Sequence, residues 1–141
     1  MLVTRETDYA LRVLRALAQG GSYTAKELSS RELLPKEFTY KILKKLEKAS
    51  LIQVTRGAAG GCCLACDLRR VSLYDLVEAV ENKARLTCCM DSGFTCDWRQ
   101  CHGGMCRIHT QLETVQEAID RELKSRSLYW VICGDGEDTK S

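Results

Sequence analysis

Apolar residues spaced by three and four positions predict an amphipathic helix at the start of the chain, from Thr4 to Gln19. Thr4 is suited to cap this helix, and Gly20 with Gly21 would end it, because glycine tolerates the left-handed conformation found at helix ends. The apolar positions form one stripe that is expected to be buried, namely Ala10, Val13, Leu14 and Leu17.

Two further helices follow directly. Thr24 and Glu27 have the spacing of a capping box, which predicts a short helix ending at Arg31. Pro35 then opens a third helix that runs to Ser50, with an expected inward face of Phe38, Ile42, Leu46 and Ala49. Five lysines lie between positions 36 and 48, against two glutamates. This pattern favours a helix-turn-helix whose third helix enters the major groove of DNA, and the alternative is a solvated helix of a helical bundle.

A β-hairpin is predicted directly after the basic helix. Residues 52–55 alternate between apolar and polar like a half-buried strand, and residues 62–65 can return as its partner. A hairpin in this place makes the unit a winged helix, with Arg56 at the wing tip, where arginine can enter the minor groove. The glycines of the turn would let the backbone approach phosphates closely; these are Gly57, Gly60 and Gly61.

After the predicted hairpin, the sequence indicates one more helix and then a long segment without periodicity. Ser72 and Asp75 form a capping pair for a fourth helix, which is expected to pack back on the first domain. From about Asn82 to Cys106 the periodicity disappears, and this segment holds five cysteines and three glycines. A loop of this length usually needs something to fold around, and a metal centre would supply it.

A long helix is expected from Arg107 to Arg126, with a narrow apolar seam formed by Ile108, Leu112, Val115, Ile119 and Leu123. A narrow seam favours pairing with a second copy of the chain over packing on its own domain. Residues 128–132 would cap the dimer, and an acidic tail would follow from Gly134 to Ser141.

The predicted fold is therefore mainly α with a small β-hairpin wing: a winged helix-turn-helix domain plus a long C-terminal dimerisation helix. The expected organisation is a DNA-binding domain over 1–82, a cysteine-rich metal or cluster loop over 83–106, a dimerisation helix and cap over 107–132, and a flexible tail over 133–141.

The distribution of charge supports a phosphate-facing first half. Residues 1–60 carry 11 Lys and Arg against 6 Asp and Glu, a net +5, whereas residues 61–141 carry 10 against 13, a net −3. No apolar run reaches the roughly 18 residues that a membrane span needs, and the N-terminus turns polar at once, as a signal peptide does not. We therefore expect a cytoplasmic protein without a membrane partner.

The densest group of soft metal ligands has the single pattern C-x4-C-x4-C-x2-H. It comprises Cys96, Cys101, Cys106 and His109. The chain has nine cysteines. An odd number without a visible export signal favours metal binding or redox sensing over a disulfide scaffold. Thiolates suit an iron–sulfur cluster, but three cysteines and a histidine also make a common zinc site, and the spacing alone leaves both open.

Four stretches of the chain carry a family resemblance. They read T-R-E-T-D-Y-A-L-R in the first helix, L-P-K-E-F-T-Y-K-I-L-K-K-L-E-K-A-S-L-I in the third, R-G-A-A-G-G in the wing and V-S-L-Y-D-L-V-E-A-V-E after it. In these stretches the chain resembles the iron–sulfur and nitric-oxide-responsive winged-helix repressors of the IscR/NsrR family. The resemblance covers about residues 1–132, and the wing and the helix after it are its most specific parts.

The resemblance implies a homodimeric bacterial regulator with a 2Fe–2S or 4Fe–4S cluster held by three cysteines, which match Cys96, Cys101 and Cys106. The fourth ligand varies in the family. It is a histidine in some members, matching His109, and in others an acidic residue in the first helix of the partner subunit, matching Asp8. Asp8 could equally form a surface ion pair with Arg12, four residues on.

The chain departs from the family pattern in two places. The spacings between the three cysteines are shorter than the usual five intervening residues, so the cluster type stays open. Cys62 stands where the wing commonly has an aromatic residue. Cys62, Cys63 and Cys66 are interpreted as packing or oxidisable thiols, and Cys88 and Cys89 as outside candidates for the metal site.

These observations favour a DNA-binding transcription regulator, a repressor in our prediction, whose affinity for a pseudo-palindromic operator is controlled by an iron–sulfur cluster. The expected DNA contacts are Lys36, Glu37, Tyr40, Lys41, Lys44, Arg56, Gly57, Gly60 and Gly61. The alternatives are a winged-helix regulator with structural zinc or a metal-free thiol switch and, more remotely, a small electron-transfer protein. No nucleophile–base arrangement is legible, so no enzymatic activity is expected.

Overall fold

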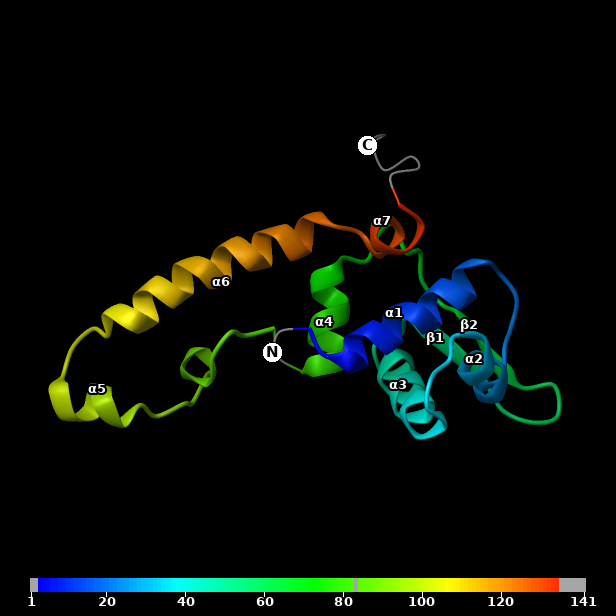
Figure 1. Ribbon diagram of the computed structural model, residues 1–141, viewed down its shortest axis with the longest axis horizontal. Coiled ribbons are helices and arrows are strands. Elements are labelled where there is room, and N and C mark those ends of the chain that lie inside the picture. Colours follow the sequence, from blue (N-terminus) through cyan, green and yellow to red (C-terminus); the bar gives the residue numbers. More distant parts are fainter. Residues whose placement is uncertain (1–2, 83, 135–141) are drawn as a thin grey trace.

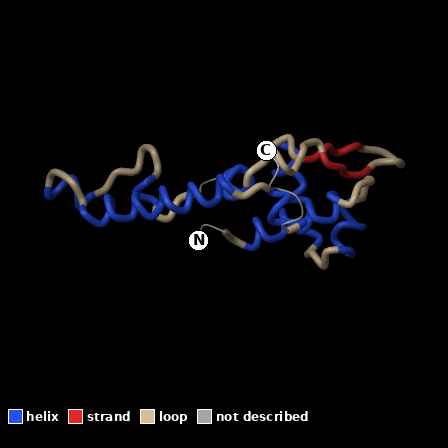
Figure 2. The backbone as a smooth tube through the Cα atoms, turned by 90° about the horizontal axis from the view of Figure 1, so that it is seen from above, coloured by secondary structure: helices blue, strands red, loops and turns tan. Residues whose placement is uncertain are grey.

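The computed structural model describes residues 3–82 and 84–134, and they form an elongated molecule with two parts (Figure 1). A helical body carries the N-terminal helices and the β-hairpin. An arm made of one long helix and the segment that runs back along it projects from this body. Seen from above, the hairpin and the tip of the arm lie at opposite ends of the molecule (Figure 2).

The first three helices begin at the residues that the sequence predicts. Helix α1 (Arg5–Ala18) follows Thr4, whose side chain accepts a hydrogen bond from the Glu6 N–H, and its predicted stripe is buried. Helix α2 (Ala25–Arg31) has the predicted capping box of Thr24 and Glu27. Helix α3 (Lys36–Lys48) follows Pro35. The prediction of a helix-turn-helix is confirmed.

The buried face of α3 differs from the prediction. Ile42 and Leu46 are fully buried as expected, but Phe38 is 41% exposed and Ala49 is also exposed. Thr39 and Leu43 take their places in the interior. The helix is therefore rotated about its axis relative to the expected face, and Phe38 contacts the edge of the Tyr9 ring, with 5.7 Å between the ring centroids.

The wing is an antiparallel hairpin of β1 (Ile52–Thr55) and β2 (Gly61–Leu64), which pair Ile52 with Leu64 and Thr55 with Gly61. Helix α4 (Leu73–Glu81) comes next and begins with the predicted Ser72–Asp75 capping box. It ends at Asn82, which is left-handed with φ of 61°. Asparagine tolerates this conformation better than most residues, and here it turns the chain out of the body.

Helix α7 (Leu128–Cys133) packs on the body of its own chain. Leu128 is fully buried in the core, beside side chains of α1 and α4, and the expectation that residues 128–132 cap a dimer stays a prediction. Backbone hydrogen bonds fix this return, since the Leu128 N–H donates to Val71 O at 2.8 Å and the Leu73 N–H to Arg126 O at 2.8 Å. Most of the predicted tail, residues 135–141, lies outside the described residues.

The cysteine-rich segment is not structureless. It contains a short 3-10 helix η1 (Cys88–Met90) and helix α5 (Asp97–His102) before the long helix α6 (Arg107–Ser125). The buried Gln116 side chain ties the start of this segment to α6, because its Nε2 donates to Ala84 O at 2.6 Å and its Oε1 accepts from the Leu86 N–H at 2.7 Å. The segment is therefore held to α6 by specific hydrogen bonds.

Helix α6 leaves part of its apolar seam uncovered. Ile108 is 72% exposed and Val115 is 47% exposed, whereas Leu112, Ile119 and Leu123 are half-buried.

In the described part of the chain, no helix is both long and apolar enough to cross a lipid bilayer.

Candidate functional site

A groove runs between the outward face of α3, the start of α2 and the wing. Its volume is about 530 Å³, and six of the predicted DNA contacts line it: Tyr40, Lys44, Arg56, Gly57, Gly60 and Gly61. Thr24, Leu43, Glu47 and Val54 complete much of its wall. Lys36 and Glu37 are exposed in the first turn of α3 but do not line this groove. The structure thus brings the predicted helix and wing residues to one face.

The wing favours glycine at all three of the predicted positions because the backbone folds tightly there. The Gly60 N–H donates to Gly57 O at 2.9 Å, which closes the turn, and Gly57 has φ of +109°. A Cβ on Gly60 would lie 2.4 Å from Thr55 O, and one on Gly61 would lie 2.5 Å from Ser22 Oγ. These glycines set the shape of the wing.

Two lysines of α3 are paired with one carboxylate of α1. Both Lys41 and Lys45 form ion pairs with Glu6, and Lys45 also donates to Val80 O at 2.6 Å. The hydrogen bonds from Lys41 and then Lys45 hold the pKa of Glu6 below its usual value. Lys41 is half exposed, so it stays at the surface that the sequence assigned to DNA, but its charge is partly neutralised there by Glu6.

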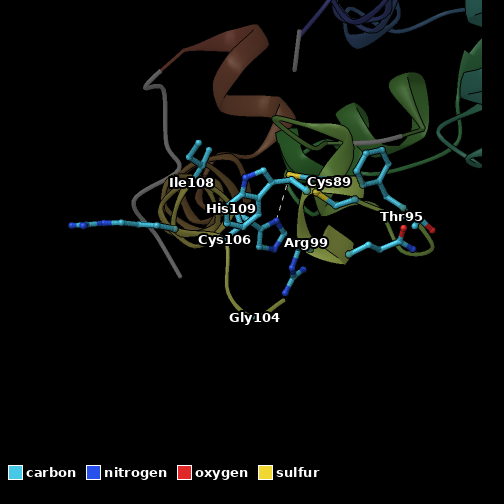
Figure 3. A pocket seen from close by; sticks show the side chains of 12 residues that line it. Cys89, Thr95, Arg99, Gly104, Cys106, Ile108 and His109 are labelled. Carbon is cyan, nitrogen blue, oxygen red and sulfur yellow. Dashed lines mark hydrogen bonds between the residues drawn. The ribbon is translucent and has the colours of Figure 1, made fainter. Parts of the chain in front are cut away.

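The second candidate site is a cavity of about 770 Å³ at the tip of the arm, between η1, α5 and the start of α6 (Figure 3). Four soft metal-ligating residues line it: Cys89, Cys96, Cys106 and His109. Cys96 and Cys106 sit at the residue before α5 and α6 respectively, so each helix start places one thiol at the cavity. Phe94, Trp98 and Ile108 supply apolar wall.

His109 is held by two contacts on opposite sides of its ring. Its Nδ1 lies 3.4 Å from the Sγ of Cys89, and its Nε2 lies 3.1 Å from a carboxylate oxygen of Glu113 (Figure 3 shows the first contact). Glu113 is one helical turn further along α6, so the helix itself sets the second contact. The imidazole is thereby fixed against a cysteine that does not belong to the C-x4-C-x4-C motif.

The predicted ligands are only partly gathered. Cys96, Cys106 and His109 share the cavity, whereas Cys101 lies exposed on α5 and does not line it. Asp8 forms the surface ion pair with Arg12, at 3.0 Å, that was its alternative interpretation. Among residues 3–82 and 84–134, no three Cys, His, Asp or Glu side chains are placed to hold one metal ion. The donor set still fits a thiophilic metal, since sulfur and imidazole donors face one apolar space.

The three cysteines in and after the wing differ in burial, since Cys63 and Cys66 are only half-buried. Cys62 is buried in the core and pairs with Val54 across the hairpin. Burial raises the pKa of the Cys62 and Cys66 thiols, which disfavours their thiolate forms. The interpretation of Cys62, Cys63 and Cys66 as packing or oxidisable thiols stays a prediction.

Sequence reasoning missed the residues that join elements distant in the chain. Glu6, Glu113 and Gln116 have ordinary positions on helix surfaces in the sequence, and only the tertiary structure shows what each one binds. Cys89 was visible as one of two adjacent cysteines, but no spacing rule singled it out. A helical repeat from His109 to Glu113 was the one available signal for that contact.

The chain matches the Rrf2 family, described as an iron-dependent transcriptional regulator, over residues 3–134. Two curated relatives are protein aau3 of Rhizobium meliloti, 30% identical over 66% of this chain and 62% of that protein, and the transcriptional repressor NsrR of Streptomyces coelicolor, 32% identical over 84% of this chain and 80% of that protein. The match to aau3 therefore spans less than two thirds of its length.

Among solved structures, the IscR protein of T. potens is similar in fold, with a TM-score of 0.69 at 21% identity over 99% of this chain and 91% of that one. The resemblance to IscR/NsrR-type regulators is thus confirmed, as is the mainly helical winged-helix fold. By the family match over nearly its whole length, the chain belongs to the Rrf2 family of winged-helix transcriptional regulators.

Proposed function

We propose that the protein is a homodimeric repressor that binds operator DNA through α3 and the wing, and that an iron–sulfur cluster in the arm controls its affinity. The observation that carries the proposal is the cavity where Cys89, Cys96, Cys106 and His109 meet, on an arm joined directly to the winged-helix body. The wing, which is proposed to contact DNA, and the arm, which is proposed to hold the cluster, lie at opposite ends of the molecule (Figure 2).

The DNA-binding half is supported by the shared face of α3 and the wing. Tyr40 and Lys44 face the groove from the helix, and Arg56 faces it from the wing. In this arrangement α3 reads base edges in the major groove, while Lys36 and Arg56 contact the backbone or the neighbouring minor groove. Binding to chromosomal operators places the protein in the cytoplasm.

Dimerisation is supported by the exposed seam of α6. Ile108 and Val115 present apolar side chains to solvent along a helix that projects from the body (Figure 1). A second copy of α6 would cover this seam by helix–helix packing. Two winged helices joined in this way would bind the two half-sites of a pseudo-palindrome.

The proposed cluster is held by the thiols of the motif, Cys96, Cys101 and Cys106, with His109 as the fourth donor of the sequence-based prediction and Asp8 as its alternative. When bound, a cluster supplies iron that oxidants or nitric oxide can attack. The three thiols would join α5 and α6 around one centre. Gln116 of α6 would then transmit a movement of that segment to the end of α4 through its hydrogen bonds with Ala84 and Leu86. Such a coupling requires the loaded and unloaded arms to differ in structure.

Anaerobic purification followed by assays for iron, acid-labile sulfide and zinc per chain tests the proposal, together with operator binding before and after removal of the metal. We expect iron and sulfide in comparable amounts, and an operator affinity that changes by at least about fivefold on cluster loss. Stoichiometric zinc without sulfide would replace the cluster by a structural zinc site. Equal affinity of both forms would contradict the sensing function.

A structural zinc site is the second candidate because the donors that line the cavity also suit it. Three cysteines and a histidine face the same space, and this set is common for tetrahedral zinc. Zinc would hold the arm in one shape without sensing. A metal-free thiol switch would instead use pairs of these cysteines, and reduction alone would then change operator affinity.

Replacing Arg56 by alanine is expected to weaken operator binding about tenfold and to lower the slope of log K against log salt by about one. Arg56 lines the groove from the wing, where it can meet the phosphate backbone or the minor groove. Fluorescence anisotropy over a salt series measures both quantities. The matched control is Arg70→Ala, since Arg70 is an exposed arginine outside the groove. Equal affinities and slopes for the two variants would remove Arg56 from the interface.

A further inference from the structure

Cys89 has polar contacts from two side chains, which a cysteine that only fills space in a core does not require. It lies in η1, where the Thr87 hydroxyl accepts from the Cys89 N–H at 3.2 Å and donates to the Cys89 Sγ at 3.2 Å. His109 Nδ1 lies 3.4 Å from the same sulfur. Two polar groups from different elements therefore converge on one thiol, and that thiol faces the arm cavity (Figure 3).

His109, by contrast, has both ring nitrogens engaged. An imidazole has only two nitrogens, and here one contacts Cys89 while the other contacts Glu113 at 3.1 Å. Neither nitrogen is free to reach a metal in this arrangement. A cysteinyl sulfur is different, because it can accept hydrogen bonds and bind a metal at the same time, and such hydrogen bonds tune metal–thiolate centres.

We propose that Cys89 is the fourth ligand of the metal centre, and that His109 and Glu113 position its sulfur without binding the metal. This inference rests on the proposed cluster and names the one ligand that the sequence left contested. The centre would then have four cysteine ligands, Cys96, Cys101 and Cys106 from the motif and Cys89 from η1. Cys89, Cys96 and Cys106 already line one cavity, so these three thiols need only draw closer together, whereas Cys101 has to turn inward.

The chain between Cys101 and Cys106 can make that movement. Gly103 and Gly104 separate α5 from α6, have positive φ of 61° and 86°, and have no neighbouring atom within 4 Å of a Cβ position. Glycine at positive φ adapts its backbone with little steric cost, so α5 can rotate its exposed thiol toward the cavity. Nothing comparable is required of Cys89, whose position is fixed by Thr87 and His109.

The test compares serine variants of the two adjacent cysteines. Cys88 is exposed and does not line the cavity, so Cys88→Ser is the matched control for Cys89→Ser. Each full-length protein is reconstituted anaerobically with iron and sulfide and, separately, titrated with Co²⁺, whose thiolate charge-transfer absorption reports the number of sulfur ligands. We expect Cys89→Ser to lose about one quarter of that absorption and to bind the metal at least about tenfold more weakly, with Cys88→Ser unchanged.

His109→Ala separates a ligand from a positioning residue. If His109 only positions Cys89, this variant keeps the full charge-transfer absorption per Co²⁺ but binds it about 10-fold to 100-fold more weakly, and Glu113→Gln shows a smaller loss of the same kind. Glu117→Gln, an exposed glutamate of the same helix that does not contact His109, should leave binding unchanged.

The other outcomes are distinct. One outcome is that Cys89→Ser binds the metal as Cys88→Ser does, while His109→Ala or Asp8→Ala loses the cluster. The fourth ligand would then be His109 or Asp8, and the assignment of Cys89 would be overturned. Wild-type protein that takes up neither iron with sulfide nor Co²⁺ would overturn the proposed metal centre itself, and the assignment with it.

Discussion

Replacing Glu81 by alanine is expected to lower the free energy of unfolding by about 3 kcal/mol, because one carboxylate oxygen satisfies three donors at the start of α1. Glu81 Oε1 accepts from the Thr4 N–H at 3.2 Å, from the Thr4 hydroxyl at 2.5 Å and from the Thr7 hydroxyl at 2.6 Å. Thr7 is fully buried. Alanine at position 81 would leave the Thr7 hydroxyl buried without its acceptor. A buried donor left unpaired costs more free energy than the loss of a hydrogen bond whose groups can turn to water.

Chemical denaturation of the wild type and the variant measures this difference directly. Glu81→Gln is the informative second variant, because its amide oxygen can still accept while the charge is gone, so it should lose about half as much. Glu47→Ala, at an exposed position of α3, should change stability by less than about 0.5 kcal/mol. A loss in Glu81→Ala no larger than in Glu47→Ala would mean that Thr4 and Thr7 find other acceptors.

The same network gives stability a defined dependence on pH. Burial alone would raise the pKa of Glu81, but the hydrogen bonds from Thr4 and Thr7 hold it below its ordinary value of 4.5. The folded protein therefore releases this proton more readily than the unfolded chain does. The contribution of Glu81 is complete above its ordinary pKa and is lost as the pH falls through the lowered value. Unfolding measured between pH 6 and pH 3 should show a steeper loss for the wild type than for Glu81→Gln.

This contact also bears on the proposed coupling between arm and body, because Glu81 stands at their junction. It is the last residue of α4, and Asn82 turns the chain into the arm directly after it. The start of α1 is held by Glu81, and α1 in turn holds Lys41 and Lys45 of α3 through Glu6. A movement of the arm that reaches the end of α4 therefore meets a connected set of contacts leading to the DNA-facing helix.

The parts of the fold that were predictable are those that neighbouring residues determine. The caps at Thr4, Thr24 and Ser72 and the stripe of α1 depend on spacings of three and four residues, which the sequence displays. The prediction of the buried face of α3 was wrong at Phe38 for a reason that lies in the tertiary structure. Phe38 is apolar and in phase with Ile42, but it meets Tyr9 at the edge of the body, and the smaller Thr39 is the residue that fits the interior.

The residues of the candidate sites also include some that local sequence could predict and some that it could not. The wing glycines and two of the motif thiols, Cys96 and Cys106, could be selected from the sequence as residues of the candidate sites because close backbone approach and metal binding each restrict residue type locally. The partner of His109 could not be found by that reasoning, since Cys89 is 20 residues away and follows a stretch that Gln116 holds against α6. The pairing of Lys41 with Glu6, 35 residues apart, was hidden for the same reason.

Replacing Val115 by arginine is expected to weaken operator binding by about 100-fold to 10,000-fold, because it would separate the two DNA-binding domains of the proposed dimer. Val115 is a large apolar side chain that is 47% exposed on α6, in the seam with Ile108 and Leu112. In a paired α6 an arginine there would bury a charge without a partner, and two like charges would meet across the axis. Each monomer would then bind a single half-site with its intrinsic affinity.

Thr114→Arg is the matched control for this substitution. It introduces the same charge at the preceding residue, which is exposed and faces away from the apolar seam. Size-exclusion chromatography with light scattering should give a dimer for Thr114→Arg and a monomer for Val115→Arg, while thermal unfolding of the body stays close to the wild type because Val115 lies outside the core. A single half-site should be bound equally by both variants, so the difference appears only on the full operator. A dimeric Val115→Arg with wild-type operator affinity would show that α6 is not the dimer interface, and the exposed seam would then need another partner.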